Sequence, residues 1–314
     1  MSDHEKIMEA LKKNHDSIIK LIGRSDVIYL DYPIHGNVGD LLIMAGTLDF
    51  FEKNSIKIKS AYPYKIGCEI QLSESDVIVF QGGGNLGDIY LEPQRVREHI
   101  VSQFPKNKII ILPQSIHFIE TKNFEKCKNI FAKHNDLHIF ARDKSSHILA
   151  KQMTKNVYLT PDMAHHLYPL MDSSKSAKIK MLYMYRNDSE AKGDLKLSNS
   201  TTTHDWNSIS SIELPYLAKF FLNFSYFISL NRYTNKFQPL VFLCWKSIIR
   251  KTIKKSVKFF NSYESVTTDR LHGHIFSCLL DKQNICYDNS YGKVYSYIDA
   301  WTMNSPLVIK GDIQ

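Results

Sequence analysis

DVIVFQGGGN, residues 76–85, joins a short apolar run directly to a glycine-rich loop. The apolar residues are continuous rather than alternating, which is typical of a parallel strand that helices cover on both faces. Similar runs occur at residues 26–31, 108–112 and 137–140. After the first of these runs, a loop leads into a helical pattern at residues 41–51. Units of strand, loop and helix predict an α/β fold with a parallel sheet.

The second half of the chain follows the same plan after a polar linker at residues 171–178. We expect its strands and helices at residues 179–185, 263–268, 270–280, 284–287 and 293–301. A chain of 314 residues exceeds the size at which one core usually stops growing. The sequence therefore predicts two domains, at residues 1–172 and 173–314. Residues 190–207 are polar, and no regular structure is expected there.

The composition, 43% hydrophobic and 23% charged, is that of a globular enzyme. No apolar stretch of roughly 18 residues offers a membrane span. Residues 1–22 predict one amphipathic helix and lack the apolar core of a signal peptide, so we expect a cytoplasmic protein. The five cysteines form an odd set without a CxxC pair, and we expect reduced core residues. They are Cys68, Cys127, Cys244, Cys278 and Cys286.

A net charge of +8 favours anionic partners. Residues 236–258 are basic throughout, with no Asp or Glu. Five apolar residues recur there at largely helical spacing: Phe242, Trp245, Ile249, Ile253 and Val257. The segment, about 236–260, suits a helix lying on the anionic inner face of a membrane, or an ordinary solvated helix that covers the second domain. Nucleic acid is not expected, because no recognised nucleic-acid-binding motif accompanies the charge.

Two loops of the first half offer backbone N–H groups to an anion. The first, HGNVGD at residues 35–40, ends in Asp40, which can cap the following helix, serve catalysis, or do both. The second contains Gly82, Gly83, Gly84 and Asn85, and predicts phosphate or sugar contact. No dinucleotide site is expected, because the acidic residue that such a site requires is missing from the βαβ unit.

Arginines follow two predicted strands. Arg142 precedes Asp143 and Ser145, which predicts either a surface ion pair with a helix cap or an anion-binding position. Arg186 follows the run at 179–185, and the same two interpretations apply to it.

Arg270, His272 and His274 begin a predicted helix, where positive charge opposes the helix dipole unless an anion is bound. Lys293 follows the next strand, and together these residues predict an anion site containing a proton donor. Zinc is a rival for His272 with His274, and for His165 with His166. Neither pair has the i, i+4 spacing of a helical metal motif, so no metal is expected.

Taken in order, these motifs resemble the polysaccharide pyruvyl transferase family, closest to its exopolysaccharide-biosynthesis branch. The motifs are HGNVGD at 35–40, QGGGN at 81–85, PQS at 113–115, RD at 142–143 with Ser145, PD at 161–162, DRLHGH at 269–274 and DNSYGK at 288–293. The match runs from about residue 30 to 300, and residues 190–262 fit less well.

The resemblance implies two Rossmann-like domains facing across a cleft, similar to GT-B glycosyltransferases. It also implies phosphoenolpyruvate as donor, a sugar or lipid-linked oligosaccharide acceptor, and no metal or other cofactor. By motif, the active-site positions are Asp40, Arg142, Arg270, His272 and Lys293.

Our hypothesis makes His272 the general acid and Asp40 the base, with Arg270 also in the catalytic set. The expected donor-binding residues are Arg142, Arg270, His272, Lys293, Gly83, Gly84 and Asn85. The expected acceptor-binding residues are Asn37, Gln114, Ser115 and Arg186. Two alternatives stay open at this point: a nucleotide-sugar-dependent glycosyltransferase of GT-B type, and a non-catalytic protein that binds glycans at a membrane surface.

Overall fold

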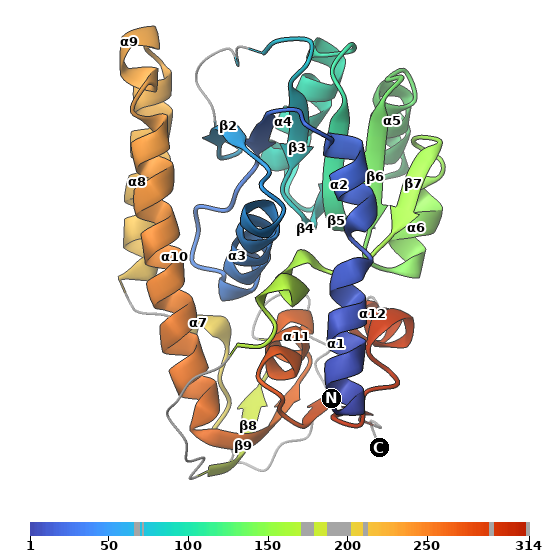
Figure 1. Ribbon diagram of the computed structural model, residues 1–314, viewed down its shortest axis with the longest axis vertical. Coiled ribbons are helices and arrows are strands. Elements are labelled where there is room, and N and C mark those ends of the chain that lie inside the picture. The colour runs from blue at the N-terminus through green and yellow to red at the C-terminus, as the bar shows by residue number, and fades with distance from the viewer. Residues whose placement is uncertain are drawn as a thin grey trace.

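The computed structural model describes residues 1–65, 70, 72–170, 179–186, 202–209, 213–288 and 292–311. Over these residues the chain forms two parallel sheets surrounded by helices (Figure 1). The predicted α/β class with parallel strands is confirmed. The GT-B-like pairing of two domains stays a prediction. The boundary expected after residue 172 and the linker at 171–178 lie outside the described residues, as does most of the 190–207 segment.

The first sheet has the strand order β2-β1-β3-β5-β6-β7, and β4 pairs with β5 beside this path. Its strands are β1 (Val27–Leu30), β2 (Ile58–Tyr62), β3 (Val77–Phe80), β4 (Gly83–Gly87), β5 (Ile109–His117), β6 (Leu137–Ala141) and β7 (Asn156–Leu159). After β2 the chain crosses to the other side of β1 to form β3. In open α/β sheets, ligands bind outside the carboxyl ends of the strands at such a reversal. The loops after β1 and β3 are therefore where a site is expected.

Apolar cores cover both faces of this sheet. In β3, Val77 and Val79 face one core while Ile78 and Phe80 face the other, because successive side chains point to opposite sides. The core of Ile78 and Phe80 also takes in residues of three helices. These are α4 (Leu91–Gln103), α5 (Thr121–Phe131) and α6 (Lys144–Ala150). The opposite core includes α3 (Val38–Lys53) and extends to the second sheet.

The second sheet has the order β11-β10-β9-β8. Its strands are β8 (Ile179–Met184), β9 (Tyr263–Thr268), β10 (Asn284–Cys286) and β11 (Val308–Lys310), with α11 (Leu271–Leu279) and α12 (Lys293–Trp301) between them. The short 3-10 helix η1 (Met163–Leu167) lies against α3. Their close approach requires Gly46, because a Cβ there would lie 2.1 Å from the carbonyl oxygen of Met163.

The N-terminal segment differs from the single predicted helix. It forms α1 (Asp3–Lys13) and α2 (Asp16–Ile22), with a break at Asn14 and His15. His15 is fully buried, and its Nε2 lies 2.8 Å from the carbonyl oxygen of Pro161. Because the helix is interrupted here, the His15 side chain contacts Pro161, in the segment that leads into η1.

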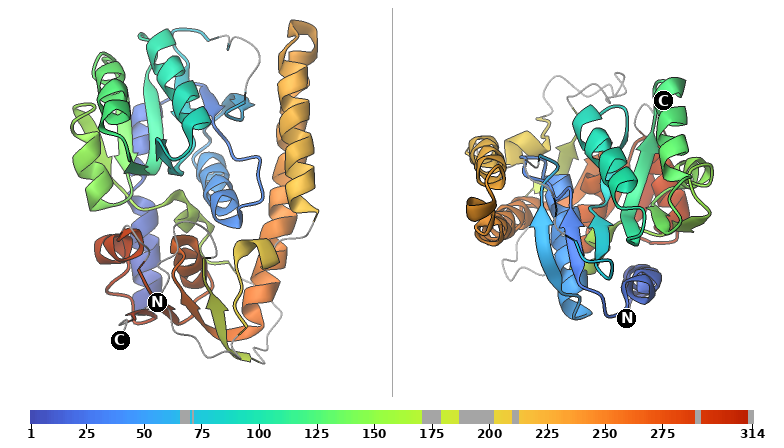
Figure 2. Two further views of the ribbon diagram at one scale, coloured as in Figure 1. Left: turned by 180° about the vertical axis from the view of Figure 1, so that it is seen from behind. Right: turned by 90° about the horizontal axis from the view of Figure 1, so that it is seen from above.

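Three helices form a hairpin that stands beside the first sheet (Figures 1 and 2). They are α8 (Leu214–Ser229), α9 (Arg232–Asn235) and α10 (Gln238–Asn261), preceded by α7 (Trp206–Ile209). The helix predicted at about 236–260 is thus present as α10. Its apolar residues Phe242, Trp245, Ile249, Ile253 and Val257 are buried and pack in the main core. These five side chains are therefore not available to enter a membrane, and attachment of the protein to a membrane stays a prediction.

The described helices contain none with the length and hydropathy that a membrane span requires. Of the cysteines, Cys127, Cys278 and Cys286 are free and buried, as predicted. The prediction is wrong for Cys244, which is exposed on α10, and Cys68 lies outside the described residues.

Candidate functional site

A pocket of about 500 Å³ is lined by loops of the first sheet together with helices α11 and α12. That volume is ordinary for a small-molecule site. Ten of the sequence-predicted site residues line it: Asn37, Asp40, Gly83, Gly84, Asn85, Arg142, Arg186, Arg270, His272 and Lys293. Gln114 and Ser115 do not line the pocket. Segments more than 200 residues apart in sequence are thus brought together at one place.

Helix α3 begins earlier than predicted, which changes the structural role of Asp40. Asn37 is the N-cap, because its side-chain oxygen accepts a hydrogen bond of 3.0 Å from the N–H of Gly39. Asp40 stands in the first turn instead, with its side chain 30% exposed. The expectation that Asp40 caps the helix is therefore wrong. Its Oδ2 lies 3.6 Å from Nε2 of His35, which also lines the pocket.

The glycine-rich segment is a short strand rather than the expected loop, since Gly83 pairs with Gln114 of β5. Gly83 has φ +143°, a conformation that side chains rarely adopt. A Cβ placed on Gly84 would lie 2.8 Å from Lys293 Nζ and 3.1 Å from Arg142 Nη2. The ammonium and the guanidinium therefore converge on one point above the backbone of Gly84.

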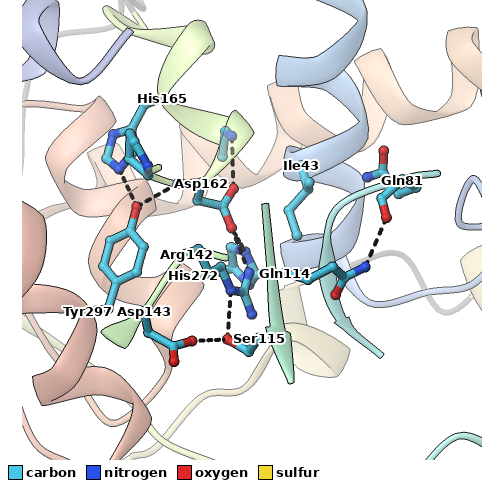
Figure 3. Close-up of polar contacts among 12 residues, drawn as sticks. Ile43, Gln81, Gln114, Ser115, Arg142, Asp143, Asp162, His165, His272 and Tyr297 are labelled. Atoms are coloured by element: carbon cyan, nitrogen blue, oxygen red, sulfur yellow. Dashed lines mark hydrogen bonds and ion pairs between the residues drawn. The ribbon is translucent and has the colours of Figure 1, made fainter. Parts of the chain in front are cut away.

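Arg142 is held by a buried set of polar contacts (Figure 3). Its Nη1 donates to Asp162 Oδ2 at 2.6 Å, and its Nε donates to Ser115 Oγ at 2.9 Å. Ser115 in turn donates to Asp143 at 2.7 Å. Arg142 is 1% exposed, so its predicted surface ion pair is wrong, whereas Asp143 does cap α6 through a hydrogen bond from Ser146 N–H. Through its hydrogen bonds with Arg142 and Asp143, Ser115 therefore helps to fix the orientation of the guanidinium.

Asp162 also contacts the imidazole of His272, which lies beside Arg142 in Figure 3. His272 Nε2 is 3.4 Å from Asp162 Oδ2. On the other side of the ring, Nδ1 lies 2.6 Å from the position that a Cβ on Gly39 would take. The imidazole is thus held between α3 and the start of η1, and its side chain is 12% exposed.

The carboxyl group of Asp162 is completely buried. Burial alone raises its pKa, but the contacts with His272 and the charge of Arg142 outweigh this effect, and the pKa lies well below its usual range. Asp162 is therefore ionised at neutral pH and attracts a proton-bearing imidazole nitrogen. One carboxylate positions both the guanidinium and the imidazole.

Asn85 and Gln114 belong to a second buried network. Asn85 Nδ2 donates to Asp31 at 3.0 Å, and Asn85 Oδ1 accepts hydrogen bonds from Arg97 and Gln114, each 3.0 Å long. Arg97 pairs with Asp31 at 2.7 Å. Gln114 is fully buried and also donates to the carbonyl oxygen of Gln81. This network holds the glycine segment against β1 and β5.

The two remaining arginines come from the second sheet. Arg270 is the N-cap residue of α11 and forms an ion pair with Asp205, which lies just before α7. Arg186 follows β8, and its backbone N–H donates to Asp269 Oδ1 at 2.9 Å. Both arginines face the pocket that Arg142 and Lys293 line.

The other histidines of the predicted motifs lie in the core. Burial lowers the pKa of His274 to about 4, and this ring lies within 2.9 Å of Asn284 and Thr302 side-chain oxygens. His165 Nε2 is 2.8 Å from the hydroxyl of Tyr297, and His166 Nε2 is 3.0 Å from His15. Across the described ranges, no group of three or more His, Cys, Asp or Glu residues is placed to hold a metal ion.

Among the ionisable pocket or supporting residues that the sequence-based set lacks are His35, Asp162 and Asp205. His35 occurs in the motif HGNVGD and Asp162 in the motif PD, so the sequence alone could have suggested both ionisable side chains as site residues. Asp205 had no signal, because its pairing with Arg270 spans 65 positions.

The comparisons with known proteins agree with these motifs. A family model described as polysaccharide pyruvyl transferase matches residues 37–291. "Putative pyruvyl transferase EpsO" of Bacillus subtilis (strain 168) is 37% identical over 308 residues, covering 97% of this chain and 94% of that protein. "Pyruvyl transferase 1" of Schizosaccharomyces pombe is 25% identical over 294 residues, covering 89% of this chain and 70% of its own length.

A solved structure is also similar. The crystal structure of a functionally uncharacterised protein from Klebsiella pneumoniae superposes with a TM-score of 0.63 at 24% identity, covering all of both chains. This likeness supports the fold alone.

Proposed function

The chain belongs to the polysaccharide pyruvyl transferase family, and we propose that it moves a pyruvyl group from phosphoenolpyruvate to a sugar of a lipid-linked surface-polysaccharide precursor. The observation that carries the proposal is the convergence of Arg142 and Lys293 above Gly84, beside His272, in one pocket.

In phosphoenolpyruvate the phosphate and the carboxylate are both attached to C2, so the two anionic groups lie side by side. Arg142 and Lys293 suit the phosphate, because a fixed guanidinium and a point charge approach the same location. Arg270 lines the same pocket and suits the carboxylate. Gly83 and Gly84 line the pocket and carry no side chains, so the donor can come close to the strand.

Ketal formation requires a proton on C3 of the enol. His272 supplies it, and C2 becomes an oxocarbenium centre that an acceptor hydroxyl attacks. Asp40, with His35 at 3.6 Å, takes the proton of that hydroxyl. A second hydroxyl of the acceptor then attacks C2, the C2–O bond to phosphate breaks, and the proton of this hydroxyl leaves with the inorganic phosphate. This step completes the cyclic ketal, and the proton held by Asp40 returns His272 to its acid form. The two side chains that transfer protons in these steps, His272 and Asp40, both line the pocket.

The acceptor enters, in this proposal, on the side of Asn37 and Arg186. Gln114 and Ser115, which the sequence assigned to the acceptor, act instead as supports for Asn85 and Arg142. The protein works at the cytoplasmic side of the membrane, where lipid-linked precursors present their sugars.

Incubation with phosphoenolpyruvate and lipid-linked oligosaccharides from the source cells tests the proposal. We expect release of inorganic phosphate together with a glycan whose mass has grown by one pyruvyl group. In D₂O the new methyl group gains one deuterium. Release of a nucleotide from a nucleotide sugar instead would establish a glycosyltransferase, and absence of any turnover with intact donor binding would favour a glycan-binding protein.

The variant Gly84→Ala tests the position of the donor phosphate. The added methyl group lies 2.8 Å from Lys293 Nζ and 3.1 Å from Arg142 Nη2, so it occupies the place where the anion binds. We expect phosphoenolpyruvate affinity to fall about tenfold while the unfolding temperature stays unchanged, since misplacement on this scale is costly. Gly36→Ala is the matched control, because its Cβ meets Pro215 at an ordinary 3.5 Å. Equal affinities for both variants would argue against this phosphate position.

A further inference from the structure

The hairpin of α8, α9 and α10 exposes more large apolar side chains than a solvated surface normally does. Its exposed aromatic residues are Tyr216, Phe220, Phe224, Phe227, Tyr233 and Phe237. Phe227 is 68% exposed and Tyr233 is 83% exposed. Leu240 and Leu243 continue the apolar surface on α10.

The aromatic residues of α8 lie on one face of that helix. Tyr216, Phe220, Phe224 and Phe227 are spaced by four, four and three positions, so they line up along the helix. Phe220 and Phe224 stack with ring centroids 5.9 Å apart. Another face of α8 is already occupied, since Phe221 packs on Trp245 of α10 at 5.9 Å. The helix therefore has an inward apolar face and a separate, exposed one.

The charge of the hairpin identifies the kind of surface that it fits. Between Glu213 and Glu264 the sequence contains no Asp or Glu, but it contains nine Lys and Arg residues. On α10, one exposed stripe begins with Leu240 and Leu243 and continues with Lys251, Lys254 and Lys258. Apolar side chains flanked by cations, without acids, are the composition of a surface that binds anionic lipids.

We infer that this hairpin docks the protein on an anionic lipid bilayer. The exposed aromatic residues of α8 and α9 enter the interface between headgroups and acyl chains, and the lysines of α10 contact the headgroups. The residues involved differ from the five buried ones that the sequence suggested for the same purpose.

The docking surface is joined to the candidate site. Trp245 of α10 donates a hydrogen bond of 2.6 Å to the carbonyl oxygen of Pro33, and Pro33 lines the pocket. At the start of α8, Pro215 lies against Gly36, between the pocket residues His35 and Asn37. If the proposed function holds, docking brings the pocket close to a lipid-linked acceptor; the lipid binding itself does not depend on that function.

Vesicle flotation of the full chain tests the inference. We expect binding to vesicles of phosphatidylcholine with phosphatidylglycerol, weakening with salt, and no binding to phosphatidylcholine alone. Changing Phe220, Phe224 and Phe227 to Asn is expected to reduce binding at least tenfold. The matched control changes the exposed Ile119 and Ile148, outside the hairpin, to Asn and retains binding.

A second pair of variants tests the charge. Lys251→Glu, Lys254→Glu and Lys258→Glu together are expected to reduce binding at least tenfold. The control variant changes three other exposed lysines to Glu: Lys122, Lys144 and Lys151, which lie on or beside α5 and α6. It alters the net charge equally and is expected to retain most of the binding. Thermal unfolding and phosphoenolpyruvate titration confirm that each variant is folded.

Three results would overturn the inference. Wild-type protein that does not float with anionic vesicles, or equal losses in the hairpin and control variants, excludes lipid docking by this surface. A lipid-free dimer that the phenylalanine changes convert to monomer, without vesicle binding, makes the hairpin a contact between copies of the chain. Flotation with a flat phosphoenolpyruvate titration would instead contradict only the proposed function.

Discussion

Replacing His272 with alanine is expected to lower turnover by a factor on the order of 10²–10⁴, the usual contribution of a positioned general acid. The imidazole lines the pocket, and ionised Asp162 lies 3.4 Å from its Nε2. Protonation of C3 then becomes the slow step. Phosphoenolpyruvate affinity should change much less than turnover, because Arg142 and Lys293 remain in place. Phosphate release and donor titration on the same preparation measure the two quantities.

Asp40→Asn provides the comparison for this result. A similar loss of turnover is expected, since the amide cannot accept the hydroxyl proton. Loss of turnover in His272→Ala alone would leave the acid assigned and the base unassigned. Near wild-type turnover in both variants would show that neither side chain transfers the proton.

Replacing Arg142 with methionine is expected to affect both stability and binding. Asp162 would remain buried and ionised without its guanidinium, which typically costs about 3–5 kcal/mol in the free energy of unfolding. Donor affinity should fall about 10-fold to 100-fold, because a charge-assisted hydrogen bond to the phosphate is lost. Chemical denaturation and calorimetric titration measure these effects separately.

The double variant Arg142→Met with Asp162→Asn separates the two effects. Removing the unpaired charge should restore much of the stability, since a neutral pair of similar volume is tolerated in a core. Donor affinity should stay low. Recovery of affinity together with stability would mean that Arg142 acts only as a structural residue.

The sequence was sufficient for the buried strands. β1, β3 and the first part of β5, residues 109–112, are continuous apolar runs with both faces covered, and such runs are recognisable without a structure. β2 and β7 were not predicted because they lie at the edges of the sheet, where half-exposed side chains weaken the pattern. β4 was taken for a loop because glycine carries no strand preference, and its pairing with β5 decides its conformation.

The site was predictable in its charged members but not in their partners. Arg142, Arg270, His272 and Lys293 follow strands or begin helices, where ligand contacts are common. The carboxylates Asp162 and Asp205 reach them through tertiary packing across 20 and 65 positions. The same limit applies to α10, whose apolar side is buried only because the rest of the chain, such as Tyr32 at 5.0 Å from Phe242, lies against it. The helical spacing of apolar residues shows that one face of a helix is apolar. It does not show whether that face packs in the protein core or against a membrane.

In the proposed function, Arg142 from the first sheet and Lys293 from the second bind the same anion. Calorimetric titration of phosphoenolpyruvate into the wild type, Lys293→Met and the Arg142→Met, Asp162→Asn double variant tests it directly. We expect saturable binding by the wild type, competition by inorganic phosphate, and at least tenfold weaker binding in both variants. Absence of saturable binding, or equal affinity in all three proteins, would contradict the account.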